Sequence, residues 1–88
     1  MKVIIDQSFE RDTRKLKDKK IKIKIADTIE EVISVKKLSD IPNCKKMKGS
    51  SNAYRIRMGE YRIGFFLQNN TVEFVRFLHR KDIYNVFP

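Results

Sequence analysis

The sequence contains little cysteine, proline and glycine, and it contains no tryptophan. Its single cysteine, Cys44, cannot form an internal disulfide, so nothing in the composition indicates an oxidising compartment. Only three consecutive apolar residues, at 3–5, precede the first aspartate, which is too short for a signal-peptide core or a membrane span. We therefore expect a cytoplasmic protein with no membrane contact.

Acidic residues are scarce relative to basic ones. Twenty Lys and Arg face eleven Asp and Glu, which gives a net charge of +9. The hydrophobic fraction of 41% argues against disorder, and a length of 88 residues predicts one domain over 1–88. The excess of positive charge indicates a polyanionic partner such as nucleic acid, or an acidic protein, unless it only keeps the surface solvated.

The first half of the chain predicts a strand followed by two helices. Residues 2–6 form the short strand, and Ser8 offers an N-cap for a helix that extends to about Lys20. The next stretch alternates like a strand at first but then recurs at helical spacing. We interpret it as a helix over 21–35, because the helical spacing extends past the usual length of a strand. The two helices then form a hairpin. A loop follows over 42–52.

Residues 54–65 predict a β-hairpin. Gly59 and Glu60 suit a two-residue type II′ turn, because glycine takes the first central position. This turn places Met58 opposite Tyr61, Arg57 opposite Arg62, Ile56 opposite Ile63, Arg55 opposite Gly64, and Tyr54 opposite Phe65. Opposed residues share a face of the sheet, so one face is apolar and packs on the helices, while the other carries the arginines and Gly64.

A further strand over 72–79 follows a loop at 69–70. A two-residue loop would place Arg76 on the apolar face, where an unpaired guanidinium is costly. We therefore expect a three-residue loop, which moves Arg76 and, by parity, Arg80 to the opposite face. The core side of the strand then carries Val75 and Phe77.

The result is a half-open sheet surface with up to five arginines, which we call the arginine face: Arg55, Arg57, Arg62, Arg76 and Arg80. Phe66 and Tyr84 flank it. Guanidinium groups bind phosphates and aromatic rings stack on bases, so the arginine face is a candidate nucleic-acid site. The alternative is that the arginines pair with Glu60, Glu73 or Asp82, or are simply solvated.

The run KKMKGSSNAYRIRMGEYRIGFF, followed by VEFVRFLHRKDIY, resembles the C-terminal half of the RelE/ParE superfamily of toxins from bacterial and archaeal toxin-antitoxin pairs. The resemblance is close over 45–84, and the first half agrees in the order and length of its elements. It implies an α+β fold in which an N-terminal strand and a helical hairpin precede a three-stranded antiparallel β-meander. The helices are then expected to pack on one face of the sheet.

The resemblance also implies a function. RelE-like toxins are metal-independent endoribonucleases, without a cofactor, that usually cut mRNA in the ribosomal A site. The ribose 2′-hydroxyl attacks the adjacent phosphate and leaves a 2′,3′-cyclic phosphate and a free 5′-hydroxyl. The implied partners are mRNA, the ribosomal RNA of the 70S ribosome, and a cognate antitoxin whose acidic, partly disordered segment joins the toxin in a hetero-oligomer.

Two alternatives share this fold. A ParE-like toxin inhibits DNA gyrase by binding and has no nuclease activity, and an inactive homologue would only bind an antitoxin. Cleavage of RNA by the protein would distinguish the endoribonuclease from both of these alternatives.

Carried over position by position, the resemblance implies a catalytic set of Arg55, Arg57, Arg62, Arg80 and Tyr84. An arginine is not deprotonated in a protein, so these arginines are expected to clamp the scissile phosphate. His79 and Tyr84 remain as candidates for proton transfer. Strand parity points His79 toward the helices, where a structural role is the alternative, and Tyr84 could instead pack beside Phe87.

Further residues are candidates for RNA contact. The residues expected to bind substrate are Lys45, Lys46, Lys48, Arg76 and Phe66. Six lysines near the junction of the two helices would either contact ribosomal RNA phosphates or keep the surface wet: Lys15, Lys17, Lys19, Lys20, Lys22 and Lys24. Cys44 has no neighbouring histidine or second cysteine in the sequence, so we expect neither a nucleophile nor a metal ligand there.

Overall fold

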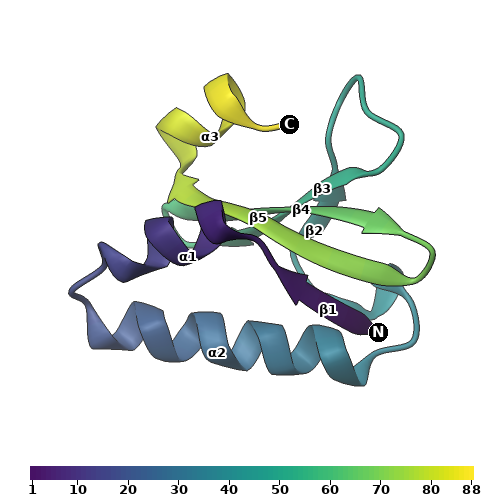
Figure 1. Ribbon diagram of the computed structural model, residues 1–88, viewed down its shortest axis with the longest axis horizontal. Helices are drawn as coiled ribbons and strands as arrows, with labels where there is room; N and C mark the ends of the chain where they lie inside the picture. Colours follow the sequence, from purple (N-terminus) through teal and green to yellow (C-terminus); the bar gives the residue numbers. More distant parts are fainter.

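The computed structural model describes residues 1–88, which form a mixed five-stranded sheet with helices on both of its sides (Figure 1). The elements, in order, are β1 (Lys2–Ile5), α1 (Gln7–Arg14), α2 (Lys19–Ser34), a short 3-10 turn (Leu38–Asp40), β2 (Cys44–Lys46), β3 (Ala53–Met58), β4 (Tyr61–Gln68), β5 (Thr71–His79) and α3 (Arg80–Val86). The strand order is β1-β5-β4-β3-β2, with β1 parallel to β5 and the other pairs antiparallel. None of the helices has the length and hydropathy needed to cross a membrane.

The predicted α+β fold with a helical hairpin is confirmed, but the boundary between the two helices is not where the sequence placed it. The N-cap of α1 is Asp6, whose carboxylate accepts hydrogen bonds from the Ser8 hydroxyl and amide, and these bonds lower the pKa of Asp6. The expected helix from Ser8 to about Lys20 was therefore wrong at both ends. Asp18 begins a new helix by accepting the amides of Lys20 and Ile21.

The β3–β4 hairpin has the predicted register at every position named above, from Met58 opposite Tyr61 to Tyr54 opposite Phe65. Gly59 has φ +59, as the first central position of a type II′ turn requires, and Glu60 has no positive φ. The predicted apolar face is also confirmed. Its members are buried or half-buried in the main core with α1 and α2: Tyr54, Ile56, Met58, Tyr61, Ile63 and Phe65.

The connection from β4 to β5 was predicted incorrectly. It is a two-residue turn formed by Asn69 and Asn70, whose φ values of 51° and 61° suit a type I′ turn. A β-bulge between Gly64 and Phe65 then shifts the pairing, so that Gly64 lies opposite Arg76. Arg76 thus faces the same way as Gly64, as expected, but the bulge rather than a longer loop achieves it.

Two smaller expectations also fail. Val75, expected on the core side of β5, is the extra residue of the bulge and packs against the opposite cluster, whereas Phe77 is in the main core. The stretch expected to be only a loop contains β2, a three-residue edge strand that pairs with β3. Two of its three residues are lysines, which are common on exposed sheet edges but give no strand signal in a sequence.

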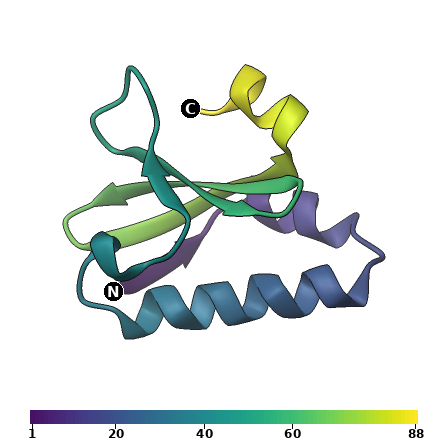
Figure 2. The same ribbon diagram turned by 180° about the vertical axis from the view of Figure 1, so that it is seen from behind.

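The arginine face is partly covered by α3, which the sequence analysis did not predict. Figures 1 and 2 show α1 and α2 on one side of the sheet, with α3 and the C-terminus on the other. A second small core forms beneath α3 from Met47, Ala53, Ile83 and Phe87. A Cβ added to Gly64 would lie 2.7 Å from Cδ2 of Phe87, so this glycine permits the close packing of the C-terminal segment on the sheet.

Candidate functional site

A basic cleft lies between α3 and the segment that joins β2 to β3. Its volume is about 390 Å³, and its lining consists of Lys45, Lys46, Met47, Lys48, Arg55, Tyr84, Phe87 and Pro88. Four of these side chains are cationic. Tyr84 is 54% exposed and therefore has a free surface on which a base can stack. The cleft thus combines phosphate-binding groups with an aromatic ring.

Asn43 connects the first two arginines of the arginine face. Its backbone oxygen accepts a hydrogen bond of 2.8 Å from Nη1 of Arg55, and its Oδ1 accepts one of 3.2 Å from Nη2 of Arg57. The same backbone oxygen also accepts the amide of Arg57. Asn43 has φ +62, a left-handed conformation that asparagine adopts more readily than most residues. The sequence carries no sign of this role of Asn43, because its partners lie 12 and 14 positions away.

Arg57 and Arg62 occupy directly opposed positions on β3 and β4, yet they diverge. Arg57 reaches outward to Asn43, whereas Arg62 folds back on the hairpin turn. Nη1 of Arg62 donates to the backbone oxygens of Gly59 at 2.8 Å and Tyr61 at 2.9 Å. These carbonyl partners reduce the repulsion that two facing like charges would otherwise cause. Nε of Arg62 is shielded from solvent and has no acceptor.

Arg80 and His79 gather around Glu60 at the end of the β3–β4 hairpin. Nε of Arg80 lies 2.8 Å from Oε2 of Glu60, and Nε2 of His79 lies 3.8 Å from the same oxygen. His79 is also the N-cap of α3, because its Nδ1 accepts the amide of Lys81 at 3.1 Å. Its ring meets Tyr61 edge-on on the side of the sheet that carries the helical hairpin, as strand parity predicted.

Arg76 and Phe66 are engaged in packing rather than in the cleft. Nε and Nη2 of Arg76 donate to the two carboxylate oxygens of Asp12 at 2.8 and 3.2 Å, and this pairing raises the pKa of Arg76. Asp12 is buried and also accepts the amide of Phe77 at 2.9 Å, so it joins α1 to β5. Phe66 packs on Phe87, with ring centroids 5.1 Å apart.

Five of the predicted site residues therefore meet in one cleft: Lys45, Lys46, Lys48, Arg55 and Tyr84. The other predicted site residues lie outside its lining. Arg57 is tied to Asn43, and Arg62 and Arg80 lie toward the hairpin turn. Glu60 was expected as a possible partner of these arginines, and its observed partner is Arg80.

Cys44 lies at the start of β2 and is half-buried. Burial raises the pKa of its thiol, although the positive charge of Arg55 acts in the opposite direction. The thiol is therefore protonated at neutral pH and is a poor nucleophile. No group of three or more His, Cys, Asp and Glu side chains gathers at one place in the structure.

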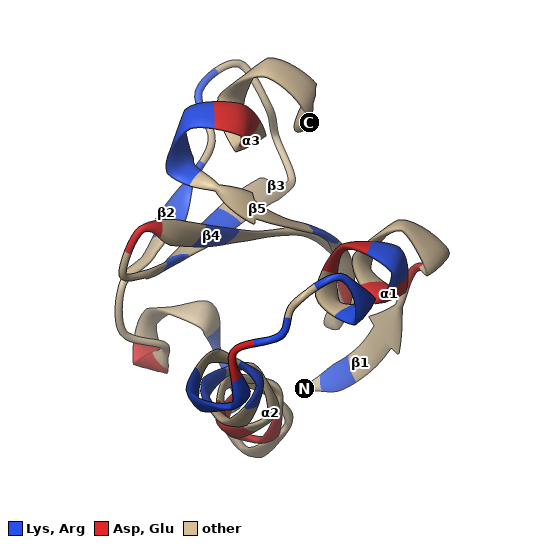
Figure 3. Ribbon diagram, turned by 90° about the vertical axis from the view of Figure 1, so that its left-hand side faces the viewer, with Lys and Arg blue, Asp and Glu red and all other residues tan.

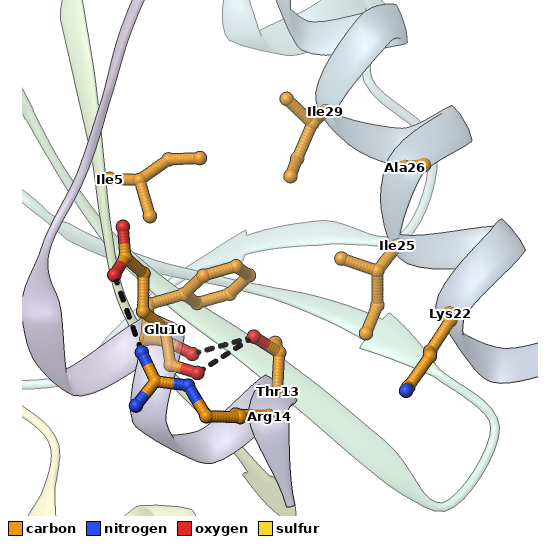
Figure 4. A pocket seen from close by; sticks show the side chains of 9 residues that line it. Ile5, Glu10, Thr13, Arg14, Lys22, Ile25, Ala26 and Ile29 are labelled. Atoms are coloured by element: carbon orange, nitrogen blue, oxygen red, sulfur yellow. Dashed lines mark hydrogen bonds and ion pairs between the residues drawn. The ribbon is translucent and has the colours of Figure 1, made fainter. Parts of the chain in front are cut away.

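A second cavity, mostly apolar, lies between α1 and α2, away from the arginine face. Its volume is about 460 Å³. Ile5, Ile25 and Ile29 surround it, and Lys22 and the exposed pair of Glu10 and Arg14 stand at its rim (Figure 4). We call this cavity the interhelical groove.

The comparisons with known proteins agree with this architecture. The family model described as the ParE toxin of the type II toxin-antitoxin system, parDE, matches residues 3–84. Toxin RelE3 of Methanocaldococcus jannaschii is 42% identical over 89 residues, which cover 100% of both proteins.

Two solved structures are similar to the chain. The toxin in the RelB-RelE antitoxin-toxin complex from Methanococcus jannaschii superposes with a TM-score of 0.82 at 38% identity, over 97% of this chain and 99% of that chain. The RelBE2 toxin-antitoxin complex from Mycobacterium tuberculosis gives a TM-score of 0.64 at 22% identity, over 90% of this chain and 96% of that chain. The second likeness shows the fold alone.

Proposed function

Because this chain belongs to the RelE/ParE family of type II toxins, we propose that it is an endoribonuclease that cleaves mRNA on the ribosome, in the cytoplasm. The observation that carries this proposal is the basic cleft, in which three lysines, Arg55 and Tyr84 face one cavity of about 390 Å³. Such a cavity suits a phosphodiester whose flanking base stacks on the tyrosine ring. The relatives named RelE support the same assignment.

The proposed reaction is an internal transesterification. The ribose 2′-oxygen forms a bond to phosphorus while the bond from phosphorus to the 5′-oxygen breaks, which leaves a 2′,3′-cyclic phosphate and a 5′-hydroxyl. Negative charge develops on the phosphate oxygens in the transition state. Arg55 in the cleft and Arg62 on the same face of the sheet are assigned to that charge, because preorganised cationic donors lower such barriers. Tyr84 is assigned to stacking on the nucleobase that flanks the scissile phosphate.

We assign His79 a structural role in this mechanism. Its Nδ1 already accepts the amide that begins α3, and Nε2 faces Glu60 and not the cleft. Glu60 in turn pairs with Arg80 and holds it at the entrance of α3. Arg80 can therefore bind a substrate phosphate only after its hydrogen bond to the Glu60 carboxylate is broken.

The chemical groups at the ends of the cleaved RNA test the proposed reaction. Purified protein mixed with ribosomes and a short mRNA is expected to leave fragments with 2′,3′-cyclic phosphate and 5′-hydroxyl ends. The alternative function rests on the ParE description of the matching family model. If mRNA stays intact while gyrase accumulates broken DNA, the ParE-like function replaces the one proposed.

A type II toxin is paired with an antitoxin, and we propose that an acidic, amphipathic segment of that partner occupies the interhelical groove. The groove is lined mostly by apolar side chains, and its rim carries Lys22 beside the Glu10–Arg14 pair, so it complements a segment with one apolar face and an acidic group placed against Lys22. A disordered segment can fold on binding to such a surface. The relative from Methanococcus jannaschii was crystallised with its RelB antitoxin.

Ala26 offers a test of this docking site, because it lines the groove yet is exposed. Ala26→Arg is expected to weaken the affinity for the cognate antitoxin by about tenfold or more, or about 1.4 kcal/mol, because it fills the groove with a charge. RNA cleavage is expected to stay unchanged. Ser34→Arg adds the same charge to an exposed position of α2 outside the groove and is the control. Equal affinities for the two variants, measured by calorimetry, would place the antitoxin elsewhere.

Asn43 offers a test of how the arginines are held. Asn43→Gly keeps the backbone oxygen and tolerates the positive φ but removes the acceptor for Nη2 of Arg57. We expect kcat/KM for RNA cleavage to fall about three- to tenfold, the scale of one exposed hydrogen bond worth about 1 kcal/mol. Asn70→Gly is a matched control, because it also has a positive φ but lies in the β4–β5 turn. A loss of activity equal in both variants would contradict this role of Asn43.

A further inference from the structure

The second half of α1, the connection between α1 and α2, and the first part of α2 carry most of the net charge of the protein. Residues 11–24 contain eight Lys and Arg and two Asp, a net charge of +6 out of +9. Both aspartates are already engaged, Asp12 with Arg76 and Asp18 as the N-cap of α2. The lysines of this segment, which we call the lysine pole, are all exposed and form no ion pair: Lys15, Lys17, Lys19, Lys20, Lys22 and Lys24.

The charged residues of α2 are arranged unfavourably for its macrodipole, with basic residues at the N-terminal end and acidic residues toward the C-terminal end. The first turn contains Lys19 and Lys20 and no acidic residue, whereas Glu30 and Glu31 approach the other end and the last turn contains no basic residue. A helix is stabilised by negative charge near its N-terminus and by positive charge near its C-terminus. This arrangement therefore lowers the stability of α2 at both ends. A sequence that breaks a local rule in this way tends to do so at a functional surface.

The lysine pole lies on the same side of the molecule as the basic end of the sheet. Figure 3 looks at this side and shows the start of α2, the α1–α2 connection, the β3–β4 turn and the start of α3 facing the viewer, with basic residues on each helix. Arg80 begins α3 there, and Arg62 folds over the turn. One continuous side of the protein thus has positive charge both at the sheet and at the helical hairpin.

We propose that the lysine pole is a docking surface for the phosphate backbone of RNA, separate from the cleft. This inference rests on the proposed function, because it assumes that RNA is the substrate. Lysine ammonium groups bind phosphates as mobile point charges and carry no information about base sequence. The pole therefore anchors RNA without sequence preference and in a salt-dependent manner, while the cleft acts on the strand.

The test compares two triple variants that lower the net charge equally, from +9 to +6. The first replaces three lysines of the pole by glutamine: Lys19, Lys20 and Lys22. The second replaces three exposed lysines at the opposite end of α2 and on β1: Lys2, Lys36 and Lys37. The probe is an RNA hairpin of about 16 base pairs, the span of a small RNA-binding domain. Its 2′-oxygens are methylated, so that binding is measured without cleavage.

The pole variant is expected to reduce the slope of log K against log[salt] by about 2 to 3, because each lost phosphate contact contributes roughly 0.7 to 0.9. The control variant is expected to change the slope by less than about 1. The melting temperature should be higher in the pole variant than in the control, because glutamine removes charges that oppose the helix dipole and has a similar helix propensity.

Equal slopes for the two variants would overturn the proposal, since the lysines would then act only through net charge. A pole variant that keeps RNA binding but loses affinity for poly-glutamate would also overturn it and assign the surface to an acidic protein. The binding assay does not depend on cleavage. A protein that binds the hairpin through the pole but cuts no mRNA would therefore contradict the nuclease function and leave the docking surface in place.

Discussion

Replacing Arg62 by alanine is expected to lower kcat for RNA cleavage by about 10²- to 10³-fold, the scale of losing one preorganised donor to a developing oxyanion. Nη1 of Arg62 is fixed by two carbonyl oxygens of the hairpin turn at 2.8 and 2.9 Å. Nε has no acceptor, and Nη2 forms no hydrogen bond in the structure. Because Nε is shielded from solvent, Nη2 is the donor of this guanidinium that is left for a charge-assisted hydrogen bond to a phosphate.

Two variants complete this experiment. Arg62→Lys retains the charge but not the fork of donors, so it is expected to recover only part of the lost rate. Arg14→Ala removes an exposed arginine on the other side of the sheet and should leave kcat unchanged. The rates are compared by single-turnover cleavage, after circular dichroism has shown that each variant is folded. A folded Arg62→Ala protein with the full rate would exclude Arg62 from the reaction.

Removing the carboxylate of Asp12 is expected to destabilise the fold by about 2 to 4 kcal/mol. The loss leaves the half-buried Arg76 guanidinium and the amide of Phe77 without an acceptor. Breaking a fully buried ion pair costs about 3 to 5 kcal/mol, and the Arg76 side chain, at 29% exposure, is partly solvated. For a domain of this size the melting temperature should fall by about 10 to 25 °C.

Denaturant unfolding of Asp12→Ala, Arg76→Met and the double variant measures this contribution. The double variant is expected to be more stable than the sum of the single losses predicts, because it leaves no unpaired charge. Asp12→Asn should lose less stability than Asp12→Ala, since its amide oxygen can still accept the Phe77 amide. Additive losses in the cycle would show that the two side chains do not stabilise each other.

The β3–β4 hairpin could be predicted from the sequence because its determinants are local. Gly59 at the first turn position sets the register, and the alternation of residues on either side then assigns every side chain to a face. The β4–β5 connection has a similar local signal in Asn69 and Asn70. The prediction failed there because it treated the strand as regular, whereas a bulge at Val75 moved Arg76 across the sheet.

Other features depend on contacts between distant residues and have no sequence pattern of their own. The pairing of Asp12 with Arg76 joins residues 64 positions apart, and Asn43 meets Arg55 and Arg57 only because β2 pairs with β3. The helix α3 was missed because its seven residues are too few for a clear helical period. The cleft itself required α3, since Tyr84 and Phe87 form its wall.

We propose above that the arginine face and the cleft of this protein cleave mRNA. The most direct measurement is a brief induction of the protein without its antitoxin, followed by mapping of new 5′ ends on cellular mRNA. The control is the triple variant Arg55→Ala, Arg57→Ala, Arg62→Ala, expressed at the same level. New 5′ ends at fixed positions within codons, absent from the control, are the predicted result. Arrested growth with intact mRNA would contradict it.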